Sequence, residues 1–208
     1  MSAHCGHHVE SKQTLASPAY RRILWWALWI NLGMFLLEVL AGVQAGSVSL
    51  LADALDFLGD SANYLISLVV LSLSLSWRAR AAQFKALSML LFGCGVLALA
   101  IWHWWQGQVP SAPTMGLIAI LALLANLAVA VLLYRYREGD SNMRSVWLCT
   151  RNDSLGNLAV VGAALGVFGT GSNWPDLLVA SIMATLAISA AVQVLKQARR
   201  ELQQGHVH

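Results

Sequence analysis

The stretch LADALDFLGDSANY, residues 51–64, places three aspartates inside a segment that is otherwise suited to crossing a membrane. The five residues before this stretch and the eleven after it carry no charge. On insertion scales each aspartate would cost about 2.5–3.5 kcal/mol at the centre of a membrane helix. A cost of this size indicates that Asp53, Asp56 and Asp60 serve a specific purpose.

The composition of the whole chain indicates a membrane protein. Of its 208 residues, 58% are hydrophobic and 11% are charged, and the mean hydropathy is +0.62. Soluble domains carry about 25% charged residues. The net charge of +3 predicts no nucleic-acid partner, because the positions of the basic residues follow a membrane topology. Cys5, Cys94 and Cys149 predict no disulfide framework.

Six apolar segments of spanning length follow one another. They cover residues 23–43, 47–76, 84–106, 114–134, 145–169 and 176–196. The sequence therefore predicts an all-α integral membrane protein with six transmembrane helices in a domain over residues 23–196. A His-containing tail (1–22) and a short tail (197–208) complete the predicted domain organisation.

The basic residues predict the orientation of these helices. Twelve of the thirteen fall on one side of the membrane: Lys12, Arg21, Arg22, Arg78, Arg80, Lys85, Arg135, Arg137, Arg144, Lys196, Arg199 and Arg200. The positive-inside rule makes that side cytoplasmic, so both termini are expected in the cytoplasm and the lipid bilayer is the surrounding partner. The thirteenth, Arg151, falls within the fifth apolar segment.

The three aspartates of the second segment share one helical face. At about 100° per residue, Asp56 and Asp60 stand roughly 40° apart, and Asp53 stands roughly 60° to the other side of Asp56. One side of this helix is therefore acidic.

The fifth segment repeats the arrangement, with Cys149, Asp153 and Asn157 at steps of four residues. Two opposed i, i+4 pairs offer four ligands, the number that Zn²⁺ prefers, and Asp oxygen and Cys sulfur are both suitable donors. A bound cation would also offset the buried negative charge. The predicted metal ligands are Asp56, Asp60, Cys149 and Asp153.

Structural roles remain open for the same acids. A buried acid can be protonated, or paired with a basic residue such as Arg151. Glu38, in the first segment, is a candidate hydrogen-bond partner between helices. Asp53 lies near the outer end of its segment, where it is solvated, caps the helix or belongs to the permeation path.

The depths of the predicted ligands raise a geometric question. Counted from the outer ends at 1.5 Å per residue, Asp56 and Asp60 lie roughly 14–20 Å deep, whereas Cys149 and Asp153 lie roughly 24–30 Å deep. A shared site requires that the fifth helix is displaced outward, or that the predicted boundaries are wrong by a turn.

The order NLGMFLLEVLAGVQAGSVSLLADALDFLGDSAN, residues 31–63, resembles the cation diffusion facilitator family of divalent-metal transporters. The resemblance runs from about residue 20 to 200, and CTRNDSLGN in the fifth segment is a weaker second signature. It implies a tetrahedral transport site in which Asp56, Asp60 and Asp153 match family ligands. Cys149 stands where the family commonly has His.

Departures from the family pattern leave two points open. Cys149 either ligates as a thiolate or leaves a three-carboxylate site, and we expect ligation. Arg151 lies about 200° around the helix from Cys149 and is expected to point away from the site. The resemblance also implies a homodimer. Because few residues follow the sixth segment, we expect a short form that lacks the cytosolic domain of the family and dimerises through its membrane helices.

We therefore expect efflux of a divalent metal ion, Zn²⁺ first, by exchange with protons across the bacterial inner membrane. Cobalt, cadmium, nickel, iron and manganese are alternative ions, and a non-transporting assembly or sensor subunit is the alternative class. The metal is cargo, so no resident cofactor is expected, and no catalytic motif indicates an enzyme. The terminal histidines either capture metal or are incidental: His4, His7, His8, His206 and His208.

Overall fold

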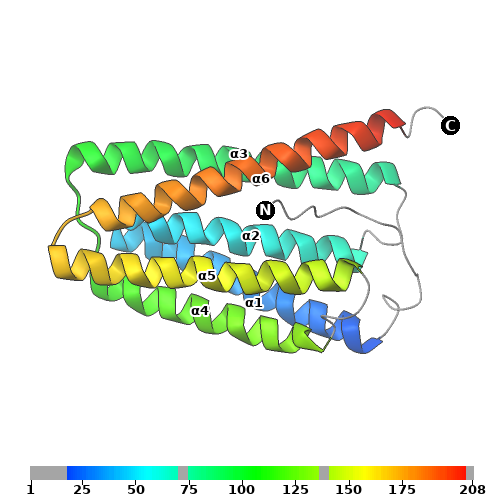
Figure 1. Ribbon diagram of the computed structural model, residues 1–208, viewed down its shortest axis with the longest axis horizontal. Helices are drawn as coiled ribbons and strands as arrows, with labels where there is room; N and C mark the ends of the chain where they lie inside the picture. The colour runs from blue at the N-terminus through cyan, green and yellow to red at the C-terminus, as the bar shows by residue number, and fades with distance from the viewer. Residues whose placement is uncertain (1–17, 70–74, 136–140, 205–208) are drawn as a thin grey trace.

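The computed structural model describes residues 18–69, 75–135 and 141–204 (Figure 1). Within these ranges, side chains at 69, 75–79, 81–82, 141–149, 151–152, 197 and 200–204 are outside the description. The elements are α1 (Pro18–Ala45), α2 (Val48–Val69), α3 (Leu75–Gln106), α4 (Ala112–Tyr134), α5 (Ser141–Thr170) and α6 (Trp174–Gln204). The described chain is an all-α membrane protein with six helices, as predicted.

Five described helical segments are long and apolar enough to cross a membrane. They are Pro18–Ala45, Gln83–Gln106, Ala112–Tyr134, Asp153–Thr170 and Trp174–Lys196. Helix α2 does not qualify by composition, because its 22 residues include three aspartates. It nevertheless packs among the other five helices. We therefore identify α2 as a membrane helix from its position in the bundle.

The two ends of the bundle differ in charge. The described basic side chains gather at the end where α1 begins and α6 ends, here called the basic end: Arg21, Arg22, Arg80, Lys85, Arg135, Lys196 and Arg199. Figure 1 shows α1, α3 and α6 reaching this end together. The arrangement agrees with the orientation predicted from the positive-inside rule.

At the opposite end, three helices stop at glycines. Gly46, Gly107 and Gly171 follow α1, α3 and α5 directly, with φ of 65°, 63° and 62°. This left-handed conformation closes the last turn of a helix and is accessible to glycine without a Cβ clash. The amide N–H of Gly171, for example, donates to the carbonyl of Val167 at 2.8 Å.

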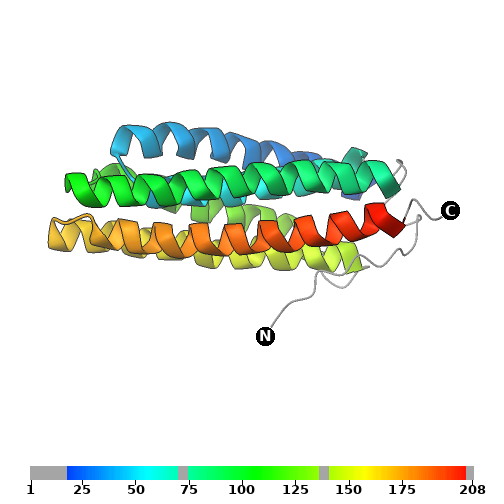
Figure 2. The same ribbon diagram turned by 90° about the horizontal axis from the view of Figure 1, so that it is seen from above.

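Helix α2 lies at the centre of the bundle. It contacts each of the other five helices, while α3 packs chiefly against α6, α1 against α2, and α4 against α5. Figures 1 and 2 show the six helices side by side along one long axis, with the α3–α6 pair adjacent in both views. The acidic face of α2 is therefore surrounded by protein.

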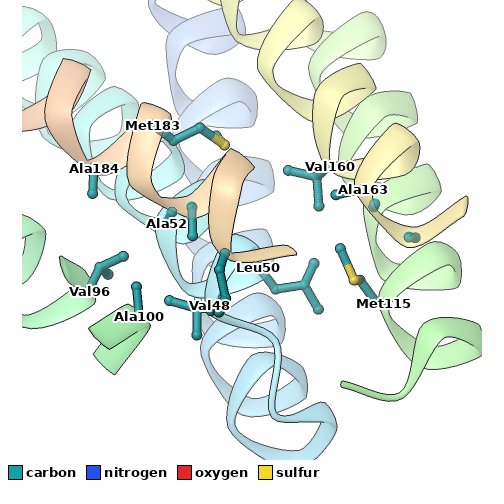
Figure 3. Packing of buried hydrophobic residues seen from close by; sticks show 14 of the residues in the cluster. Val48, Leu50, Ala52, Val96, Ala100, Met115, Val160, Ala163, Met183 and Ala184 are labelled. Atoms are coloured by element: carbon teal, nitrogen blue, oxygen red, sulfur yellow. The ribbon is translucent and has the colours of Figure 1, made fainter. Parts of the chain in front are cut away.

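The apolar core near the opposite end joins α2 to α3, α4, α5 and α6. Figure 3 shows small and medium side chains from these helices in contact, among them Ala52 on α2, Ala100 on α3 and Ala163 on α5. Small residues let helix backbones approach closely inside a membrane. The close packing therefore brings these helices together near the opposite end of the bundle.

Large apolar side chains cover the outside of the bundle. Leu124 on α4, Phe168 on α5 and Leu186 on α6 are each more than half exposed. Exposed tryptophans lie near both ends: Trp25, Trp26 and Trp29 near the basic end, and Trp102, Trp104, Trp105 and Trp174 near the opposite end. Tryptophan favours the membrane–water interface, so its positions mark the two edges of the predicted bilayer.

Candidate metal site between α2 and α5

The three aspartates of α2 lie on its inward side. Asp53 is fully buried and Asp60 exposes 7% of its surface. Asp56, one turn from Asp60, is partly buried. Their burial agrees with the shared face predicted from their spacing.

The carboxyl groups of Asp60 on α2 and Asp153 on α5 lie within hydrogen-bonding range of each other. A bond between them requires a proton on one of the two, because ionised carboxylates only accept. Oδ2 of Asp153 has no donor among the described residues. Two acids from different helices therefore meet inside the bundle.

Asp56 adjoins α5 at a glycine. A Cβ atom placed on Gly156 would lie 3.8 Å from Oδ2 of Asp56 and 3.5 Å from Cε of Met183 on α6. The missing side chain at Gly156 therefore leaves room for the Asp56 carboxylate beside α5. Asp56 also interacts electrostatically with Asp60 and Asp153, so the three acids influence one another across the interface.

Asp60 and Asp153 lie at the same depth in the bundle because α5 is displaced along its axis relative to α2. Asp60 lies twelve residues after Val48, about 18 Å along α2, and Asp153 lies seventeen residues before Thr170, about 26 Å along α5. Their meeting requires that α5 extends roughly 8 Å beyond α2 at the opposite end. Figure 1 shows α5 projecting past α2 there. Of the two explanations left open by the sequence, the outward displacement is confirmed.

The described acids do not yet form a closed cage. Among the side chains that the structure describes, no three His, Cys, Asp or Glu residues converge closely enough to hold a metal together. The fourth predicted ligand, Cys149, lies in α5, but its side chain is outside the described residues, as is that of Arg151. The terminal histidines also lie outside them. The predicted set of Asp56, Asp60, Cys149 and Asp153 stays a prediction.

Two hydroxyl groups join the acid pair on its basic side. The Tyr64 hydroxyl donates to Oδ2 of Asp60 at 3.1 Å and lies 2.8 Å from Oγ1 of Thr150. Sequence reasoning assigned no role to either residue, although Tyr64 follows Asp60 by four positions and so continues the same helical face. This four-residue spacing is the sequence feature from which the position of Tyr64 beside Asp60 could have been predicted.

A basic side chain also approaches the site. Lys85 on α3 donates to Oδ1 of Asn63 on α2 and interacts electrostatically with Asp60. The sequence placed Lys85 in the basic connection before the third span, without relating it to the acids. The positively charged Lys85 side chain therefore lies on the side of Asp60 that faces the basic end.

A second acid pair lies between α1 and α2. Glu38 and Asp53 are both fully buried, their carboxyl groups face each other, and no other described residue donates to them. The predicted role of Glu38 as a partner between helices agrees with this contact. Of the roles considered for Asp53, solvation and helix capping are wrong, because its carboxyl group is buried and accepts no hydrogen bond from a described backbone amide. The first amides of α2 donate instead to Asp176, in the first turn of α6.

Asn157 continues the acidic face of α5. It is fully buried, and neither its amide nitrogen nor its amide oxygen has a hydrogen-bond partner among the described residues. A buried polar group without a partner destabilises a fold by about 1–3 kcal/mol. The Asn157 amide is therefore a buried polar group that no described hydrogen bond compensates.

Comparison with known proteins agrees with this arrangement. Residues 24–203 match the cation efflux transmembrane domain. The match includes the acids of α1, α2 and α5 described above, and it covers most of the chain.

Curated relatives resemble this chain over most of its length. The zinc transporter ZitB of Escherichia coli (strain K12) is 29% identical over 98% of this chain and 68% of its own. ZitB of Pectobacterium atrosepticum is 29% identical over 98% of this chain and 65% of its own. The cadmium, cobalt and zinc/H(+)-K(+) antiporter of Bacillus subtilis (strain 168) is 23% identical over 90% and 65%. The chain thus spans about two thirds of the length of these relatives.

Proposed function

The chain belongs to the cation efflux family, which the sequence resemblance to the cation diffusion facilitators had indicated, and from this premise we propose that it exports a divalent metal ion across the bacterial inner membrane. The observation that carries the proposal is the meeting of Asp60 and Asp153 between α2 and α5. Buried acids are costly in a membrane and mark ion pathways.

In the proposed mechanism the ion is held between α2 and α5. Asp60 and Asp153 supply two adjacent carboxylates, and Asp56 supplies a third from one turn away on α2. Cys149 supplies a fourth donor four residues before Asp153. A doubly charged ion would draw these groups together, because its charge offsets their mutual repulsion.

Protons are the proposed exchange partner. A carboxylate must be deprotonated to bind metal, whereas a water-poor site favours the neutral acid when it is empty. Metal entering from the cytoplasm therefore releases protons, and protons entering from the other side favour release of the metal. Alternating access would expose α2 and α5 first to one side of the membrane and then to the other.

Zn²⁺ is the ion that we propose first. Carboxylate and thiolate ligands suit it, and a thiolate at Cys149 would disfavour Mn²⁺. The ZitB relatives are described as zinc transporters, and the Bacillus subtilis relative as an antiporter of cadmium, cobalt and zinc. Co²⁺ and Cd²⁺ are therefore the first alternatives to test, and the same assay compares them.

A homodimer through the membrane helices stays a prediction. The outside of the described bundle is apolar on several helices, and such a surface suits both lipid and a second copy. Cross-linking of the full chain in liposomes, compared with its mass in detergent, measures the oligomeric state.

The experiment that tests the proposed function is metal-driven proton flux in proteoliposomes. We expect external or internal Zn²⁺ to drive proton movement with the wild-type chain, and a double Asp60→Ala, Asp153→Ala variant to lose it. Cys94→Ala, on the exposed side of α3, is the control and should keep the flux. Unchanged flux in the double variant would contradict the proposed site.

A packing role for the same acids predicts a different result. If Asp60 only stabilises the bundle, Asp60→Asn should lower the yield of folded protein. If Asp60 binds metal, the variant should be made in normal yield and lose binding. Yield and binding measured on one preparation separate the transporter from the non-transporting subunit.

A further inference from the structure

We propose that Tyr64 is a positioning residue for Asp60, and that Thr150 on α5 holds Tyr64 in place. The inference rests on the proposed function, because Asp60 is one of the proposed ligands. The Tyr64 hydroxyl donates to Oδ2 of Asp60 at 3.1 Å and lies 2.8 Å from Oγ1 of Thr150. Tyr64 exposes 1% of its surface and Thr150 none.

The donors in this chain of hydroxyls have a defined order. An ionised Asp60 only accepts, so the single hydroxyl hydrogen of Tyr64 is directed at it. The Tyr64 oxygen then remains an acceptor for the Thr150 hydroxyl. The chain runs from Thr150 on α5 through Tyr64 to Asp60 and so joins the two helices of the site.

Apolar packing fixes the tyrosine ring independently of its hydroxyl. Tyr64 belongs to a buried cluster with Tyr20 and Leu24 of α1, and Val129 and Leu133 of α4. A ring held on its apolar sides presents its hydroxyl at a defined position. Asp60 therefore meets a pre-placed donor.

The hydrogen bond determines which oxygen of Asp60 faces an ion. With Oδ2 held by Tyr64, Oδ1 is the oxygen available for metal. Carboxylates that bind metals are commonly held by such outer partners, whose loss lowers affinity or activity about 10–100-fold. Tyr64 would thus orient the ligand without touching the ion.

The position of Tyr64 and Thr150 along the bundle has a second consequence. Tyr64 lies four residues beyond Asp60 toward the basic end of α2, and Thr150 lies three residues before Asp153 at the same side of α5. An ion that enters from the basic end passes this contact before it reaches the acids. The contact between Tyr64 and Thr150 is a hydrogen bond between two hydroxyls, so it can open without breaking an ion pair.

The test is Zn²⁺ binding to the purified full-length chain by calorimetry, together with transport kinetics in proteoliposomes. For Tyr64→Phe we expect Kd to rise about 10–100-fold, and KM to rise while the maximal rate stays within about twofold. The melting temperature without metal should stay near that of the wild type, because the ring packing is kept. Tyr20→Phe, a buried tyrosine of the same cluster on α1, is the matched control and should bind normally.

Variants of Thr150 form the second part of the same experiment. Thr150→Val removes the hydroxyl at constant size and should weaken binding in the same direction by a smaller factor, whereas Thr150→Ser keeps the hydroxyl and should restore it. If Tyr64→Phe does not fold, this pair still decides the question. Wild-type-like Kd in Tyr64→Phe or in Thr150→Val overturns the positioning role and leaves the proposed function intact. No Zn²⁺ binding by the wild type overturns both.

Discussion

The carboxylate of Asp176, in the first turn of α6, accepts a hydrogen bond from the hydroxyl of Ser47 at 2.7 Å. It also accepts from the amide N–H of Val48 at 2.8 Å and from the amide and hydroxyl of Ser49 at 3.1 and 2.7 Å. The hydroxyl of Ser47 in turn accepts from the amide of Leu50. The first turn of α2 is therefore capped by its own serine and by an acid from another helix.

Removing this cap should destabilise the bundle. Asp176→Ala leaves two backbone amides and two hydroxyls without their buried acceptor. Because each unsatisfied buried donor costs about 1–3 kcal/mol, we expect the free energy of unfolding to fall by about 3 kcal/mol or more. Asp176→Asn keeps one acceptor oxygen and should lose less. Thermal unfolding in detergent compares the two; equal melting temperatures for Asp176→Ala and the wild type would contradict the cap.

The space at Gly156 can be tested by filling it. Gly156→Ala should be tolerated, because its Cβ would meet Asp56 and Met183 at ordinary contact distances. Gly156→Val adds methyl groups against the Asp56 carboxylate and should lower Zn²⁺ affinity while the protein still folds. Gly162→Val is the control on the same helix, since nothing lies within 4 Å of a Cβ there. Equal binding by the two valine variants would show that Asp56 does not face α5.

The buried pair of Glu38 and Asp53 predicts an unequal response to two substitutions. Glu38→Gln supplies an amide donor to Asp53 and should keep the melting temperature near that of the wild type. Glu38→Leu leaves Asp53 fully buried without a polar neighbour from α1, and burying an unpaired polar group costs about 1–3 kcal/mol or more. Thermal unfolding of both variants provides the comparison, and identical values would show that the two acids do not depend on each other.

How much the sequence predicts depends on whether a feature is local. The shared face of Asp56 and Asp60 follows from helix periodicity alone, and so does the continuation of the α5 face from Asp153 to Asn157. Five of the six helices follow equally from apolar runs, which a membrane requires of each segment separately, whereas the run of α2 is interrupted by three aspartates. These features needed no knowledge of the neighbouring helices.

Features that join two helices could not be predicted in the same way. The meeting of Asp60 with Asp153 was predicted from the repeated i, i+4 spacing and the family resemblance, but the height of α5 beside α2, on which this meeting depends, does not follow from the sequence of either helix alone. The hydrogen bond of Tyr64 to Thr150 depends further on the rotation of α5. Asp176 was not foreseen as the cap of α2, because sequence rules for caps consider only residues near the helix start.

The most direct test of the central claim is the stoichiometry and affinity of Zn²⁺ binding to the purified chain, measured for the wild type and for Asp60→Asn, Asp153→Asn and Cys149→Ala. An ion held between α2 and α5 predicts one tightly bound Zn²⁺ for each chain and loss of that binding in either aspartate variant. A weaker loss in Cys149→Ala would assign the sulfur as the fourth ligand. Undiminished binding in both Asp60→Asn and Asp153→Asn would contradict the account.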